Sequence, residues 1–223
     1  MSDGSTLKAV IFDMDGVLID SEPLHFEVDT TVLKSLNLEL EPNYLEQFVG
    51  FTTPAMWTAI KSQFSIERSL EELISLQSKT KLAYLKKSAY GPIEGILDIL
   101  EELEIYKIPI GIASSSPRIF IEAVIDKIGV SDYFSVWVSG EEVEKSKPEP
   151  DVFFKCAQVL GIEPENCLVI EDSRNGTIAA KKAGMKCIGF QNLNSGNQDL
   201  SMADLIVPNM REVNLGRMKS LFI

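Results

Sequence analysis

The sequence is poor in cysteine and histidine, the side chains that form disulfides and bind soft metal ions. Its three cysteines, Cys156, Cys167 and Cys187, are widely spaced and form no C-x-x-C pair. This usage is typical of a reducing cytoplasm, where cysteine serves as a small buried hydrophobic residue. The single histidine, His25, excludes any Ser-His-Asp triad that does not contain it. We therefore expect a cytoplasmic protein.

Several features that would indicate particular partners are also missing. No apolar run reaches the ~18 residues of a membrane span, and the polar N-terminus does not have the pattern of a signal peptide. The sequence has 21 lysines and arginines against 33 aspartates and glutamates, which gives a net charge of 21 − 33 = −12. It contains no long run of basic residues. Such an acidic surface repels nucleic acids and anionic membranes, so we expect neither as a partner. The glycine-rich nucleotide-binding patterns G-x-x-x-x-G-K-[ST] and G-x-G-x-x-G do not occur.

Short apolar runs alternate with amphipathic stretches through the second half of the chain, and one more apolar run lies near the N-terminus. This alternation predicts parallel strands joined by right-handed helical crossovers, which is a doubly wound α/β fold. The strands are nearly continuous in apolar residues, as expected for a sheet covered on both faces. The expected strands are 9–12, 108–113, 136–138, 168–170, 187–190 and 205–207, and the expected helices of this part are 96–104, 118–128, 152–160 and 175–183.

The region 20–91 departs from this alternation, because its periodicity is helical only. Within it, Ser69-Leu-Glu-Glu72 matches the capping-box pattern that opens a helix. We therefore predict two domains, an α/β core of residues 1–19 and 92–223 and a helical cap of residues 20–91.

Polar and charged side chains follow four of the six expected strands. In an open parallel sheet, ligands bind outside the carboxyl ends of the strands, near the point where the strand order reverses. Charged residues at such positions are expected to have a role, because burying an unpaired carboxylate is costly. The residues concerned are Asp13 and Asp15, then Ser114 and Ser115, then Lys147, and finally Glu171 and Asp172.

Four carboxylates that converge on one edge of a sheet need a cation. Oxygen ligands without histidine or cysteine nearby indicate Mg²⁺ rather than Zn²⁺. A hard cation with few protein ligands usually keeps waters and shares a phosphate oxygen with its substrate. Lys147 as a point charge and Ser114 as a hydroxyl donor would complete a phosphate-binding site. The predicted chemistry is phosphoryl transfer.

The two aspartates after the first strand can take different parts in that reaction. A carboxylate bound to Mg²⁺ can attack phosphorus and form an aspartyl-phosphate. A second carboxyl group, two residues later, can protonate the leaving oxygen and then deprotonate the attacking water. Asp13 comes first at the strand end, so we assign the attack to Asp13 and the proton transfers to Asp15.

These residues resemble, in order, the four motifs of the haloacid dehalogenase superfamily. The matching segments are Phe12-Asp-Met-Asp-Gly-Val17, Ser114, Lys147-Pro148 and Ile170-Glu-Asp-Ser173. Within the superfamily, the chain is similar to the β-phosphoglucomutase and sugar-phosphatase branch, whose helical cap lies between the first two motifs. The resemblance covers nearly the whole chain and implies a Rossmann-like core.

The resemblance also implies roles for these residues. It implies that Asp13 is the nucleophile, that Asp15 is the general acid and base, and that Ser114 and Lys147 bind the transferring phosphoryl group. The acid at position 15 favours a phosphatase or a phosphomutase, because family dehalogenases and phosphonatases lack it. The implied Mg²⁺ ligands are Asp13, Asp172, the backbone carbonyl of Asp15 and, through water, Glu171.

Two cap residues are further candidates for substrate binding. The family's mutases carry a histidine at the position of His25, although a surface or hinge histidine is the competing interpretation. In β-phosphoglucomutase, an arginine that holds the second phosphate follows the loop equivalent to 50–52, and here that position is Thr53. Losing such a bidentate clamp is a large change.

The main prediction is therefore a Mg²⁺-dependent phosphatase for a small phosphorylated metabolite such as a sugar phosphate, acting as a monomer. A phosphomutase of the β-phosphoglucomutase type is the alternative. A non-catalytic ligand-binding protein that keeps the fold is the remote alternative.

Overall fold

The computed structural model describes residues 6–41, 43–48 and 53–222, and the chain divides into two compact units. One unit comprises Met1–Asp20 and Tyr90–Ile223, and the other comprises Ser21–Ala89. The boundaries expected from the sequence differ from these by one residue on the first connection and by two on the second. No helix in the described ranges is long and apolar enough to cross a membrane.

The first unit is built on a six-stranded parallel sheet with the order β3-β2-β1-β4-β5-β6. This order is that of a doubly wound, Rossmann-like sheet, so the predicted fold class is confirmed. The central strand pairs on both sides, because Val10 lies opposite Ile110 in one neighbour and Leu168 in the other. The strands are β1 Ala9–Phe12, β2 Ile110–Ser114, β3 Val136–Ser139, β4 Cys167–Glu171, β5 Lys186–Phe190 and β6 Leu205–Val207.

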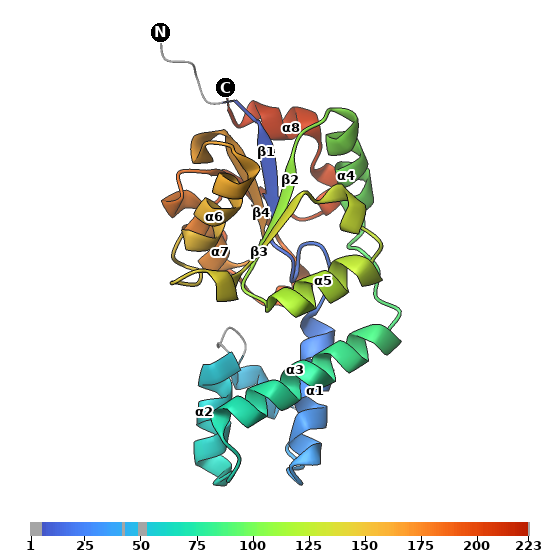
Figure 1. The fold of residues 1–223 in the computed structure, drawn as a ribbon, viewed down its shortest axis with the longest axis vertical. Helices are drawn as coiled ribbons and strands as arrows, with labels where there is room; N and C mark the ends of the chain where they lie inside the picture. The colour runs from blue at the N-terminus through green and yellow to red at the C-terminus, as the bar shows by residue number, and fades with distance from the viewer. Residues whose placement is uncertain (1–5, 42, 49–52, 223) are drawn as a thin grey trace. The chain divides into compact units, whose positions relative to one another are not determined.

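Helices cover both faces of this sheet. Figure 1 shows α6 and α7 on one face and α4, α5 and α8 on the other. Every residue of β1, β2 and β4 is buried, which explains why these strands read as continuous apolar runs. The helices are α4 Ile96–Ile105, α5 Arg118–Lys127, α6 Asp151–Leu160, α7 Arg174–Lys182 and α8 Leu215–Ser220, with short 3-10 turns η2 Ser131–Tyr133, η3 Gly140–Glu142, η4 Pro164–Asn166, η5 Leu193–Ser195 and η6 Met210–Glu212.

Close packing holds helix α6 against β2. A Cβ atom on Gly111 would lie 2.6 Å from the Sγ of Cys156, so the strand needs a glycine where the helix crosses it. All three cysteines are buried free thiols, as the sequence predicts. On the other face of the sheet, Phe12 meets Phe134 edge to face with ring centroids 6.0 Å apart.

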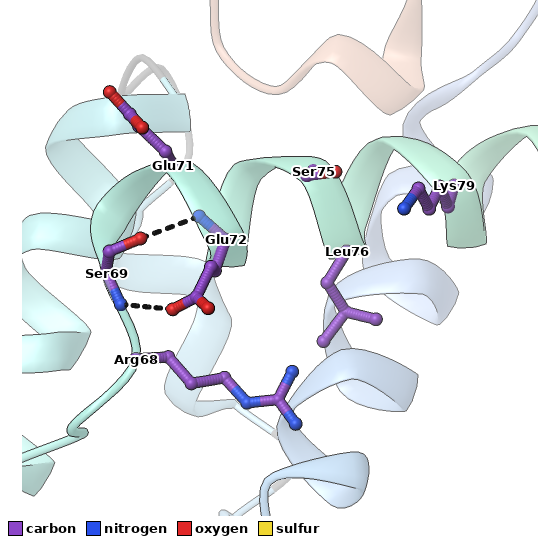
Figure 2. A pocket seen from close by; sticks show the side chains of 7 residues that line it. All are labelled: Arg68, Ser69, Glu71, Glu72, Ser75, Leu76 and Lys79. Carbon is purple, nitrogen blue, oxygen red and sulfur yellow. Dashed lines mark hydrogen bonds between the residues drawn. The ribbon is translucent and has the colours of Figure 1, made fainter.

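The described residues of the second unit form helices and the loops between them, with no strand. It contains α1 Glu22–Ser35, the 3-10 turn η1 Tyr44–Phe48, α2 Thr53–Phe64 and α3 Leu70–Lys87. The predicted capping box at the start of α3 is confirmed: Ser69 Oγ accepts a hydrogen bond from the Glu72 amide at 3.1 Å, and the Glu72 carboxylate accepts one from the Ser69 amide at 2.7 Å (Figure 2).

Side-chain hydrogen bonds join α1 to α3 at two places. Thr31 and Tyr84 share a hydroxyl hydrogen bond of 2.7 Å, and the buried amide of Gln77 donates to the buried carboxylate of Asp29.

Candidate active site

The carboxyl ends of β1, β2 and β4 meet around the ammonium group of Lys147. The lysine lies in the loop between η3 and α6, and its side chain is only 6% exposed. Its Nζ donates to Asp13 Oδ1 at 2.5 Å, to Glu171 Oε1 at 2.8 Å and to the carbonyl of Ala113 at 2.9 Å. These bonds use all three ammonium protons. The ammonium group of Lys147 therefore lies between two buried carboxylates at the point where the strand order reverses.

Burial and charge oppose one another at this pair. Burial by itself would lower the pKa of Lys147, but Asp13 and Glu171 raise it above its ordinary value, so the ammonium stays charged. Burial raises the pKa of Asp13 well above its usual range, and Lys147 opposes that shift. The neighbouring carboxylates of Glu171 and Asp172 add to the increase. The charge of Lys147 therefore favours the ionised form of Asp13, whereas burial and the neighbouring acids favour the protonated form.

Residues at the start of helix α7 hold the carboxylate of Glu171 in place. Its Oε2 accepts hydrogen bonds from the amide of Ser173 at 2.8 Å and from the Ser173 hydroxyl at 2.9 Å. Ser173 also caps α7 by accepting from the Gly176 amide at 3.0 Å. A Cβ atom on Gly176 would overlap the Glu171 carboxylate, so glycine is required where the helix passes over it. These contacts fix Glu171 with one oxygen toward Lys147.

Asp13, Glu171 and Asp172 form an acidic cluster, in which one oxygen of each residue lies within 4.8 Å of the others. Burial and the charge of Glu171 raise the pKa of Asp172 to about 8. Together the three acids can carry more negative charge than one lysine offsets, so a bound cation would stabilise their ionised forms. The donor set is oxygen only, so these residues fit a hard divalent cation.

Asp15 lies in the turn after β1, half-buried. Its Oδ2 accepts a hydrogen bond of 2.7 Å from the hydroxyl of Ser116, and Ser114 Oγ accepts from the amide of Ser116 at 3.0 Å. The serine loop after β2 is thereby tied to the turn after β1. Gly16 continues that turn with φ of +80°, a conformation that favours glycine.

The structure brings most of the predicted residues of the core together, with small corrections to their positions. Ser114 and Glu171 are the last residues of β2 and β4, whereas we expected both to follow their strands. Ser115 lies in the bend after β2 and is exposed.

The two cap candidates belong to the helical unit. His25 lies half-buried in α1, and Thr53 is the first residue of α2. The loop 50–52 that precedes Thr53 lies outside the described residues. The substrate-binding role of His25 and Thr53 stays a prediction. One turn after His25, burial raises the pKa of Asp29, while the hydrogen bond from Gln77 and the charge of His25 oppose that shift.

A surface pocket of about 410 Å³ lies along α3 in the helical unit, and Figure 2 shows its side chains. Because the capping box already satisfies the amide of Glu72, this helix start offers a weaker anion site than an uncapped one. The lining residues differ from all the predicted site residues. They are Arg68, Ser69, Glu71, Glu72, Ser75, Leu76 and Lys79.

Sequence reasoning missed three polar side chains of the core site. Ser116 holds Asp15, Ser195 donates to Asp172, and Asn192 donates to the carbonyl of Gly16. The last two follow β5, a strand end that carries no charged residue. Their place after a strand end is the one signal that the sequence carries for Asn192 and Ser195, and it does not identify their partners.

Comparison with known proteins agrees with this geometry. The family model for haloacid dehalogenase-like hydrolases matches residues 10–190. Hexitol phosphatase B from Escherichia coli K12 is 32% identical over 198 residues, which are 84% of this chain and 85% of that protein. A phosphorylated carbohydrates phosphatase from Thermotoga maritima is 30% identical over 186 residues, which are 82% and 84% of the two chains.

A solved structure shows the same fold. The β-phosphoglucomutase from Clostridium difficile superposes with a TM-score of 0.80 at 21% identity, covering 97% of each chain. The resemblance predicted from the four motifs is thus confirmed. The chain is an enzyme of phosphoryl transfer and belongs to the haloacid dehalogenase-like hydrolase family.

Proposed function

We propose that this chain is a Mg²⁺-dependent phosphatase that hydrolyses a small phosphorylated metabolite through an aspartyl-phosphate. The observation that carries the proposal is Asp13, which lies at the end of β1 inside the acidic cluster and pairs with Lys147 at 2.5 Å. The substrate class we propose is a sugar phosphate or sugar-alcohol phosphate, because the similar proteins from E. coli and T. maritima are named as phosphatases of hexitols and of phosphorylated carbohydrates.

The proposed reaction has two steps. In the first, an oxygen of Asp13 attacks phosphorus, the bond from phosphorus to the ester oxygen breaks, and Asp15 gives its proton to that oxygen. In the second, Asp15 takes a proton from water, and the water oxygen attacks phosphorus. The bond between phosphorus and Asp13 then breaks, which releases inorganic phosphate and restores the carboxylate.

The surrounding residues hold the phosphoryl group in place. In this proposal, Lys147 contributes positive charge to the phosphoryl oxygens, and Ser114 and Ser115 contribute hydroxyl donors. Bound Mg²⁺ supplies charge neutralisation for the phosphoryl oxygens and for the acids that surround them. Its proposed ligands are Asp13, Asp172, the carbonyl of Asp15 and, through water, Glu171.

The test measures phosphate release from a panel of sugar phosphates, sugar-alcohol phosphates and nucleotides, with Mg²⁺ and with a chelator. We expect release that requires Mg²⁺ and disappears in Asp13→Asn, which replaces a charged nucleophile by an amide of the same shape. Circular dichroism of the variant provides the control for folding. Turnover retained by Asp13→Asn would contradict the covalent mechanism.

The same assay separates hydrolysis from the alternatives. Given glucose 1-phosphate and a trace of the bisphosphate, a phosphatase releases phosphate, whereas a phosphomutase forms glucose 6-phosphate. Thr53 in place of an arginine clamp favours hydrolysis. A panel without either product would leave a ligand-binding role. We further propose that the enzyme acts as a monomer in the cytoplasm, where its buried free thiols would stay reduced.

A further inference from the structure

The loop that follows β5 connects two parts of the candidate site. The side-chain amide of Asn192 donates to the carbonyl of Gly16 at 3.0 Å. Three residues later, the hydroxyl of Ser195 donates to Oδ2 of Asp172. One short loop therefore holds both the turn after β1 and the acid after β4.

The contact between Ser195 and Asp172 is buried and closely packed. Ser195 is 8% exposed and Asp172 is 5% exposed. A Cβ atom on Gly16 would overlap the Asp172 carboxylate and would lie 2.8 Å from the Oγ of Ser195. The carboxylate therefore packs against both the glycine turn and the serine hydroxyl.

Hydrogen bonds within the loop hold Ser195 in position. The side-chain oxygen of Asn192 accepts from the Asn194 amide at 2.9 Å. Gln198 donates to the carbonyl of Ser195 at 2.9 Å and accepts from the amide of Arg174, the first residue of α7, at 3.1 Å. The side chain of Asn194 donates to the carboxylate of Asp20. A loop with this many partners can impose an orientation on the carboxylate that it touches.

We propose that Ser195 is a positioning residue, which orients the carboxylate of Asp172 to bind the divalent cation. The proposal rests on the proposed function, in which Asp172 is a ligand of Mg²⁺. A hydroxyl that donates to one carboxylate oxygen restricts rotation of the group and directs the remaining lone pairs toward the cation. Loss of such an outer-shell partner typically weakens metal affinity ~10–100-fold.

The test measures the Kd of the full chain for Mg²⁺ by calorimetry. Ser195→Ala should raise this Kd ~10–100-fold. Ser195→Thr, which keeps the hydroxyl, should restore most of the affinity. The matched control is Ser201→Ala, because Ser201 lies exposed in the segment that follows. In the phosphatase assay, Ser195→Ala should raise the Mg²⁺ concentration for half-maximal rate while kcat at saturating Mg²⁺ stays near that of the wild type.

The outcomes separate this inference from the proposed function. If wild-type protein binds Mg²⁺ and Ser195→Ala binds it as tightly as Ser201→Ala does, Ser195 has no positioning role. If the wild type itself binds no Mg²⁺, the proposed function fails first. Should the alanine variant lose the wild-type circular dichroism spectrum, Ser195→Cys replaces it, since a thiol of similar volume is a weak donor and should cause the same loss of affinity.

Discussion

At the scale of the residue, Lys147 compensates the negative charge of the buried acids in the site. It is nearly inaccessible to solvent, and its three protons all have oxygen acceptors. Removing one partner from a buried ion pair is costly, because the other charge stays in a medium that solvates it poorly. Here the lysine compensates two carboxylates, Asp13 and Glu171, so its loss exposes both to that penalty.

We predict that Lys147→Ala lowers the free energy of unfolding of the metal-free protein by ~3–5 kcal/mol, because it leaves buried charge uncompensated. Urea unfolding gives the value. The control is Lys182→Ala, which removes an exposed pair with Glu149 at 2.7 Å. That variant should lose no more than ~1 kcal/mol. Equal losses in the two variants would contradict the role of Lys147.

A second residue-scale prediction concerns the proton on the leaving group. Asp15→Ala should lower kcat by ~10²–10⁴-fold for alkyl phosphates, whose leaving oxygen needs a proton. With p-nitrophenyl phosphate the loss should be much smaller, because that leaving group departs as a stable anion. Steady-state kinetics with both substrates decide the question. Losses of the same size would count against Asp15 as the acid.

At the scale of the element, the start of α3 is stabilised by its reciprocal capping box. Ser69→Ala removes the acceptor for the Glu72 amide and should destabilise the helical unit by ~1 kcal/mol. Hydrogen exchange of the first turn of α3 gives a local readout of this loss. Ser75→Ala, on the exposed side of the same helix, should cause none. If both alanines behave alike, the cap contributes nothing.

The elements were largely predictable from the sequence, and their ends were less so. Strand β6 spans Leu205–Val207 as expected, and α5 ends one residue early, at Lys127. The short helix α8 and the 3-10 turns carry too few residues for a periodicity, so pattern analysis does not find them. β2 begins at Ile110 rather than at 108, because an apolar run does not show which of its residues pair with a neighbouring strand.

At the scale of the whole molecule, negative charge dominates, with a net charge of −12 and three of the acids buried together. Binding of Mg²⁺ to the folded state alone should therefore stabilise the protein. At 100 times Kd, the gain is about 2.7 kcal/mol. For a chain of this size, that corresponds to an increase in Tm of roughly 5–10 °C.

Thermal unfolding with Mg²⁺ and with a chelator measures this increase. Asp172→Asn should abolish it, because the amide that replaces the carboxylate is a poorer ligand for a hard cation. An equal increase in Tm for the wild type and for Asp172→Asn would place the cation elsewhere.

The motifs at the strand ends could be predicted because the chemistry requires charged residues at those positions. The order of strands and helices could be predicted because burial imposes a period on the sequence. Asp13, Asp15, Lys147, Glu171 and Asp172 could be named from these two rules. The hydrogen-bonding residues Ser116, Asn192 and Ser195 could not be named in this way. The role of an uncharged polar residue in a loop depends on which residues folding places beside it. Residues 23 positions apart, Asp172 and Ser195, meet because β4 and β5 pair in parallel and carry both loops to one edge of the sheet. Hydrogen bonds between distant loops depend on that register, which local patterns do not encode.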